Sequence, residues 1–237
     1  MGRSIFIGDV HGCARELGEL LELVAPVAGD AVYFVGDLVA RGPDSRGVLR
    51  FYREVGAKGV IGNHEARVLE VRAARLKGEE GPRIGASHEA LLRELEDADW
   101  ALLDALPLYL DVKAQDVRVV HAGMVPGMPL RKHDAWTLTH IRSVSDDGRP
   151  SSDPGRESWA ANYREKPHLV FGHDARRGLQ LHPSATGLDT ACVYGGSLTA
   201  LVLPTGETMP FPKDRRELLV SVRAHGAYYT SAEFARE

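Results

Sequence analysis

The chain has 237 residues, of which 43% are hydrophobic and 26% are charged, which is the composition of an ordinary globular protein. Its net charge of −4 argues against a protein that binds nucleic acid or a membrane surface. Its two cysteines, Cys13 and Cys192, are too few for a disulfide framework and fit a reducing compartment. Because no signal-peptide pattern precedes the first apolar run and no segment approaches the roughly 20 apolar residues of a membrane span, we expect a cytoplasmic protein with no membrane partner.

The first part of the chain alternates between short apolar runs and helical periodicity. The predicted elements, in chain order, are strand 4–7, helix 14–24, strand 31–35, a helix ending at residue 56, strand 59–61, and helices 66–77 and 89–103. Strands alternating with helices are typical of an α/β core. A functional site is then expected in the loops at the carboxyl ends of the strands.

The second part of the chain predicts short strands without long helices between them. These strands are expected at residues 108–112, 117–120, 169–171, 179–181, 198–203 and 207–211. Residues 145–155 contain two prolines, two glycines and three aspartates, which favours a mobile insertion. Because no linker, repeat or low-complexity segment divides the chain, we expect residues 1–237 to form one α/β domain with two sheets.

Metal-ligand side chains follow five of the predicted strands at the point where each strand ends. They are Asp9, His11, Asp37, Asn63, His121 and His173. A carboxylate at the end of a buried strand is costly unless it is paired or bound to a metal. Any one histidine could be a buried, hydrogen-bonded imidazole, but a glycine lies next to or near each position and permits tight turns that aim the side chains inward. Together these residues predict a site for divalent ions.

Two divalent ions about 3.5–4 Å apart would share at least one carboxylate, and we predict that Asp37 is that bridge. Asp9 and His11 are separated by one residue on an extended loop, so both are expected to reach the first ion. Asn63, His121 and His173 would supply a neutral oxygen and two imidazoles to the second ion.

These motifs resemble the signature of the calcineurin-like metallophosphoesterases. The matching stretches, which span residues 8–197, are GDVHG at 8–12, GDLVARG at 36–42, GNHE at 62–65, HAG at 121–123, GH at 172–173 and GLDTACVYGGSL at 187–198. They look most like the branch that holds bacterial serine/threonine phosphatases and symmetrical diadenosine tetraphosphatases. The resemblance implies an α/β fold, a four-layer αββα sandwich of two mixed sheets. It also implies a dinuclear centre with the six ligands above, and Mn²⁺ as the expected ion, with Co²⁺ or Fe as alternatives.

Two positions depart from the pattern of this family. Asp174 follows His173 where the family more often has threonine. Ala40 stands where the protein phosphatases of the family usually carry aspartate, whereas symmetrical tetraphosphatases commonly show the same Val-Ala-Arg-Gly form. Ala40 therefore favours an enzyme whose leaving group is a phosphate, because such a group leaves without the strongly supported acid that an alkoxide requires.

Three further residues are predicted to act on the phosphate. His64 would donate a proton to the leaving oxygen, with a helix-capping role as its alternative. Arg41 would clamp a phosphoryl oxygen rather than form a surface ion pair, and Arg142 resembles a downstream phosphate-contacting arginine of the branch. Tyr194 could stack on a base or belong to the core. The histidines without a motif are expected to be ordinary residues: His88, His133, His140, His168, His182 and His225.

The resemblance implies a hydrolase that cleaves diadenosine tetraphosphate symmetrically to two ADP through a metal-activated water. The alternative is a metal-dependent protein serine/threonine phosphatase. A non-catalytic scaffold would be marked by a lost ligand, and all six are present. The expected partner is thus a small nucleoside polyphosphate, with no nucleic acid and no obligate protein partner.

Overall fold

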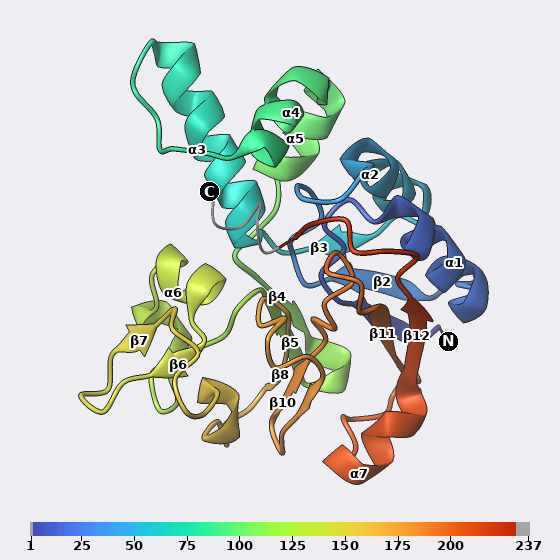
Figure 1. Ribbon diagram of the computed structural model, residues 1–237. Coiled ribbons are helices and arrows are strands. Elements are labelled where there is room, and N and C mark those ends of the chain that lie inside the picture. The colour runs from blue at the N-terminus through green and yellow to red at the C-terminus, as the bar shows by residue number, and fades with distance from the viewer. Residues whose placement is uncertain (1, 231–237) are drawn as a thin grey trace.

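Two mixed five-stranded sheets lie at the centre of the computed structural model, which describes residues 2–230 (Figure 1). The strands of the first sheet, in spatial order, are β12 (Leu219–Arg223), β11 (Ser197–Leu203), β1 (Ser4–Ile7), β2 (Ala31–Phe34) and β3 (Lys58–Gly59). Those of the second are β4 (Tyr109–Val112), β5 (Val117–Val120), β8 (His168–Phe171), β10 (Ala185–Gly187) and β9 (Gln180–Leu181). In the first sheet β1, β2 and β3 run parallel, whereas β11 pairs antiparallel with both β1 and β12. In the second sheet β5, β8 and β10 run parallel, and the two outer strands β4 and β9 pair antiparallel with them.

The alternation of side chains along a strand explains why the two sheets stack. In β1, Phe6 faces a buried cluster that also contains Val119 and Val170 of the second sheet. Ile5 and Ile7, on the other face of the same strand, belong to the cluster formed with the helices. An apolar face on each side of the sheet requires a layer on each side, which gives the four-layer sandwich that the sequence predicts.

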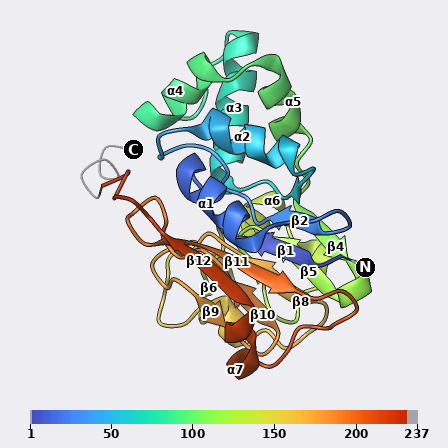
Figure 2. The same cartoon turned by 90° about the vertical axis from the view of Figure 1, so that its right-hand side faces the viewer.

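Seven α-helices surround the sheets in the described part of the chain. They are α1 (Ala14–Val24), α2 (Ser45–Glu54), α3 (Asn63–Lys77), α4 (Ala86–Glu94), α5 (Asp97–Asp104), α6 (Ala135–His140) and α7 (Pro212–Arg215). Helices α3, α4 and α5 gather at one end of the molecule, as Figure 2 shows. None of the helices within residues 2–230 has the length and apolar character needed to span a membrane.

The structure corrects two of the predicted elements and shows a hairpin within the segment predicted as a mobile insertion. The helix predicted at 89–103 is two helices, because Glu96 caps the start of α5 with a reciprocal capping box. Residues 207–211 are not a strand, since Pro210 cannot donate to a sheet ladder, and the last strand is β12. Residues 145–155 belong largely to a hairpin of β6 (Ser143–Val144) and β7 (Pro150–Ser151).

Candidate metal centre

The loops at the carboxyl ends of five strands bring the six predicted ligands together. Asp9 and His11 follow β1, and Asp37 follows β2. Asn63 opens α3 beyond β3, while His121 and His173 come from the second sheet, directly beyond β5 and β8. Because the parallel strands of both sheets end on the same side, ligands far apart in the sequence meet at one edge of the sandwich.

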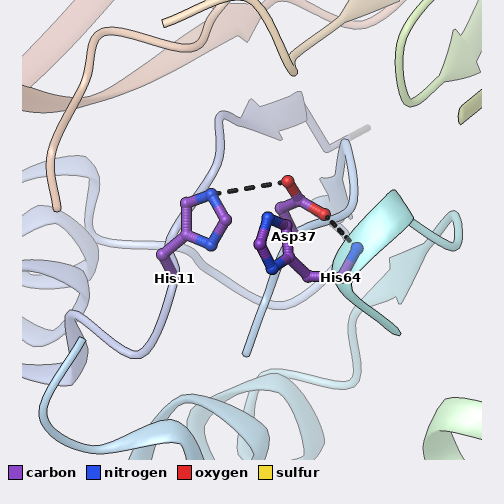
Figure 3. A group of neighbouring side chains, drawn as sticks. All are labelled: His11, Asp37 and His64. Carbon is purple, nitrogen blue, oxygen red and sulfur yellow. Dashed lines mark hydrogen bonds and ion pairs between the residues drawn. The ribbon is translucent and has the colours of Figure 1, made fainter. Parts of the chain in front are cut away.

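Asp37 lies between the two halves of the site. Its Oδ2 is 3.4 Å from Nε2 of His11 and 3.4 Å from Nε2 of His121. Its Oδ1 accepts a hydrogen bond of 3.1 Å from the backbone N–H of His64 (Figure 3). The residue has a left-handed φ of 50° and only 2% of its surface is exposed, so the carboxylate is buried and fixed between the histidines.

Backbone carbonyls fix which nitrogen of each predicted histidine ligand carries the proton. The outer nitrogens of the three rings face carbonyl oxygens: His11 Nδ1 lies 3.3 Å from Val39 O, His121 Nδ1 lies 2.8 Å from Val35 O, and His173 Nε2 lies 3.1 Å from His140 O. A carbonyl can only accept, so each outer nitrogen must donate. In the neutral imidazole the inner nitrogen is then an unprotonated donor atom for a metal.

The inner nitrogens of His121 and His173 face an oxygen rather than a hydrogen-bond donor. Nε2 of His121 lies 3.0 Å and Nδ1 of His173 lies 2.9 Å from Oδ1 of Asn63. A nitrogen lone pair against an oxygen lone pair is repulsive, and a cation between them turns the same contact into shared coordination. The residues present therefore fit divalent metal ions.

Two groups of ligand atoms in this site are close enough to hold an ion. One consists of His11, Asp37 and His64, the other of Asp37, His121 and His173, and within each group the ligand atoms lie within 4.8 Å of one another. Asp37 belongs to both groups. His64, which we predicted as a proton donor, lies beside His11 and Asp37 in the first group, and Asp9 belongs to neither group.

Asp9 nonetheless borders the site. Its Oδ2 accepts a hydrogen bond of 2.9 Å from the backbone N–H of His173, while its Oδ1 is buried without a hydrogen-bond partner among residues 2–230. Burial, together with the carboxylates of Asp189 and Asp37, raises the pKa of Asp9 well above its usual value. A nearby cation would compensate this cost, so Asp9 remains compatible with a ligand role.

A cavity of about 560 Å³ lies beside the two groups of ligand atoms, and three arginines line it. Arg41 lies with Nη1 3.5 Å from Nε2 of His11, and its guanidinium carbon is 5.6 Å and 5.2 Å from the ring centres of Tyr194 and Tyr229. Arg142 donates to the carbonyls of Ser152 and His173 at 3.1 and 3.3 Å. Arg176, which the sequence analysis did not single out, lines the same cavity.

Two carboxylates that sequence reasoning missed hold the loops of the site. Glu65 is fully buried and accepts four backbone hydrogen bonds of 2.8–3.1 Å, from Asp37, Leu38, Val39 and Gly62. Asp174 accepts a bond of 2.6 Å from Arg177 and lies 3.9 Å from Arg142. The sequence shows aspartate at position 174 where the family more often has threonine, but it does not show which residues Asp174 contacts.

His88 was expected to be an ordinary helix residue, and the structure contradicts this. Its Nε2 lies 3.0 Å from Nδ1 of His64. Asp189 also lines the cavity, and its pKa is raised to about 6, chiefly by burial. Asp189 belongs to the stretch 187–198 that resembles the family, so the sequence could have indicated it as a site residue. No motif marks His88.

Comparisons with known proteins agree with this architecture. The model of the calcineurin-like phosphoesterase family matches residues 2–216. A relative from Nitrosomonas europaea named bis(5'-nucleosyl)-tetraphosphatase, symmetrical, is 30% identical over 87% of this chain and 97% of its own. One from Halalkalibacterium halodurans named bis(5'-nucleosyl)-tetraphosphatase PrpE, asymmetrical, is 30% identical over 91% of this chain and 95% of its own.

Solved structures give the same picture at the level of the fold. A crystal structure of a candidate diadenosine tetraphosphatase superimposes with a TM-score of 0.80 at 35% identity, covering 94% of both chains. A protein serine/threonine phosphatase from Saccharomyces cerevisiae superimposes with a TM-score of 0.56 at 15% identity, covering 97% of this chain and 82% of its own, which shows a shared fold alone.

Proposed function

Because the chain belongs to the calcineurin-like phosphoesterases, we propose that it hydrolyses diadenosine tetraphosphate symmetrically to two ADP. The family makes it a metallophosphoesterase. The substrate and the position of cleavage are our proposal, since related tetraphosphatases carry both the symmetrical and the asymmetrical name.

In this proposal Asp9, His11, Asp37, Asn63, His121 and His173 hold two divalent ions, with Asp37 shared and Mn²⁺ the expected metal ahead of Co²⁺ or Fe. When bound, such ions supply Lewis acidity that polarises phosphoryl oxygens and lowers the pKa of water. Arg41 and Arg142 orient the phosphoryl group through charged hydrogen bonds. His64 faces the leaving oxygen and donates a hydrogen bond to it.

The observation that carries the proposal is the set of three arginines in the cavity. Arg41, Arg142 and Arg176 line it, and the lining also contains histidines and the three carboxylates of Asp37, Asp153 and Asp189. A phosphoserine side chain offers one phosphoryl group, whereas a tetraphosphate offers a row of them. Three guanidinium groups match the longer anion better, because a tetraphosphate offers several phosphates for them to pair with.

The surroundings of His64 favour an anhydride over a phosphoprotein. No carboxylate stands at position 40, and burial lowers the pKa of His64 well below its usual value, against the opposing charge of Asp37. A neutral imidazole is a weak proton source for a serine alkoxide. It suffices for a nucleoside diphosphate, whose terminal phosphate has a second pKa of about 6.

Chromatography of the products from diadenosine tetraphosphate tests the proposal. We expect ADP as the sole nucleotide product, and a slower release of phosphate from a phosphoserine peptide at equal enzyme concentration. His64→Ala should lower the rate on the peptide by a larger factor than the rate on the tetraphosphate. ATP and AMP appearing together would indicate asymmetrical cleavage, and faster turnover of the peptide would favour the protein phosphatase; either result overturns the proposal.

A further inference from the structure

The guanidinium group of Arg41 lies beside two tyrosine rings that come from a distant part of the chain. Its carbon is 5.2 Å from the ring centre of Tyr229 and 5.6 Å from that of Tyr194. The two rings meet at 72°, with their centres 6.2 Å apart. The two distances from Arg41 lie within the range of about 6 Å in which the face of an aromatic ring attracts a cation. Both rings therefore contribute to holding the guanidinium at the edge of the metal centre.

The two tyrosines differ in their relation to the cavity. Tyr194 lines the cavity together with Arg41, and it belongs to the stretch 187–198 that resembles the family. Tyr229 is 5% exposed and belongs to the apolar cluster that the first sheet forms with the helices. Because Tyr229 is buried in this cluster, we expect it to influence a substrate in the cavity through Arg41.

The chain beyond β12 returns to the loop that contains Tyr194 and places Tyr229 there. The backbone N–H groups of Tyr228 and Tyr229 both donate to the carbonyl oxygen of Val193, at 2.9 and 3.1 Å. Ala227 also pairs with Tyr194 in an isolated antiparallel bridge. These backbone contacts fix the two tyrosines beside Arg41 relative to each other.

A buried carboxylate of α1 anchors the same segment. Glu16 is fully buried, and its Oε1 accepts hydrogen bonds of 2.9 Å from the backbone N–H of His225 and 2.7 Å from the hydroxyl group of Tyr228. Tyr228 thus points to α1, whereas its neighbour Tyr229 contacts Arg41. The position of Tyr229 is set by contacts within the protein, so the ring is in place before a substrate binds.

Support by aromatic rings suits an arginine that has to bind a phosphoryl group. A carboxylate partner would accept hydrogen bonds from the N–H groups that the phosphoryl oxygens need. A ring attracts the guanidinium through its face, so the N–H groups in the plane of the guanidinium keep their capacity to donate. The arginine side chain also has many rotamers, and holding it in one of them removes an entropic cost from substrate binding.

We propose that Tyr229 is a positioning residue that holds the guanidinium of Arg41 in the orientation in which it meets the phosphoryl group. This inference rests on the proposed function, in which Arg41 orients that group. Tyr229 itself does not act on the substrate.

The position of Arg41 in the metal-free enzyme gives the first test. Aromatic rings shift the NMR resonances of groups that lie over their faces, so the side-chain resonances of Arg41 should lie upfield of their ordinary values in the wild type. These resonances are identified by their loss in Arg41→Ala. Tyr229→Phe should keep the upfield shift because it keeps the ring, and Tyr229→Leu should reduce it. This measurement needs neither metal nor substrate.

A double-mutant cycle gives the functional readout. Tyr229→Leu should lower kcat/KM on diadenosine tetraphosphate by about 2- to 30-fold, the range of one cation–π contact, while Tyr229→Phe should stay close to the wild type. In the Arg41→Ala background Tyr229→Leu should cause no further loss, because the residue through which it acts is gone. Tyr163→Leu, which removes another buried tyrosine ring from a different apolar cluster, is the matched control and should leave kcat/KM unchanged.

Equal losses from Tyr229→Leu in the wild-type and Arg41→Ala backgrounds would show a merely structural role and overturn the inference. Equal losses in Tyr229→Phe and Tyr229→Leu would assign the effect to the hydroxyl group and overturn it as well. Side-chain resonances of Arg41 without an upfield shift in the wild type would contradict the contact, even if a variant failed to fold. If diadenosine tetraphosphate is not hydrolysed, the same cycle with p-nitrophenyl phosphate still tests the inference, and that failure refutes the proposed substrate alone.

Discussion

Replacing Arg41 by alanine should reduce turnover of diadenosine tetraphosphate by about 10²- to 10⁴-fold while the metal content stays unchanged. The guanidinium lies 3.5 Å from Nε2 of His11 and against the rings of Tyr194 and Tyr229, so it is held at the edge of the metal site. Two charge-assisted hydrogen bonds to a phosphoryl group contribute about 1.5–3 kcal/mol each, and each 1.4 kcal/mol is tenfold in rate.

The effect on folding should be small by comparison. Losing the two contacts with the tyrosine rings costs about 0.5–1 kcal/mol each, against a typical total stability of about 5–15 kcal/mol. Arg41 has a left-handed φ of 69°, and alanine and lysine share any strain that this backbone imposes. Arg41→Lys is therefore a matched control, and it should recover little activity because a point charge cannot form the bidentate contact.

Steady-state kinetics with metal analysis of the same samples is the assay. Wild-type turnover in Arg41→Ala would remove the residue from the site. Loss of metal together with activity would show that Arg41 acts on the fold of the loop, and full rescue by lysine would contradict the argument from geometry.

Three other perturbations test neighbouring parts of the molecule. Asp174→Thr should raise KM several-fold without loss of metal, because Arg142 then loses the carboxylate 3.9 Å away; an unchanged KM would refute this role. Glu65→Gln should lower the free energy of unfolding in urea by about 2–4 kcal/mol, because an amide cannot accept all four backbone bonds that the carboxylate accepts, and equal unfolding midpoints would contradict this. Burial lowers the pKa of His168 to about 3, so the unfolded chain takes up a proton below its ordinary value of 6.5 that the folded protein refuses. Wild-type stability should therefore fall between pH 6.5 and 3 by on the order of 4 kcal/mol more than that of His168→Gln, and parallel pH profiles would refute it.

Local sequence patterns were sufficient to predict the helices and strands that carry the predicted metal ligands. The helix predicted at 14–24 has those bounds in α1, because apolar residues recur at helical spacing and Pro26 follows. The strands before Asp9, Asp37, His121 and His173 are β-branched or apolar runs, and the ligands follow them directly. Since side chains beyond parallel strands converge, sequence order alone predicted which residues would meet.

Contacts between segments that are distant in the sequence could not be predicted from these local patterns. His64 and His88 are 24 residues apart on separate helices, and no motif in the break between those helices indicates that the two rings meet. Glu65 is the last residue of the recognised motif GNHE, but its four backbone partners depend on how the loop after β2 packs against the start of α3. The position of the His64 ring beside His11 and Asp37 likewise depends on side-chain conformations that no spacing encodes.

The count of bound metal ions in the wild type and in Asp37→Asn tests the central claim, that Asp37 joins two ions in one hydrolytic site. The wild type, stripped with a chelator and reconstituted with Mn²⁺, should bind two ions per chain and regain activity, with Mn²⁺ or Co²⁺ restoring it better than Ca²⁺. Asp37→Asn should bind close to none, since Oδ2 of Asp37 lies 3.4 Å from a histidine nitrogen of each half of the site. Two ions retained in Asp37→Asn, or full activity of the wild type without metal, would contradict the claim.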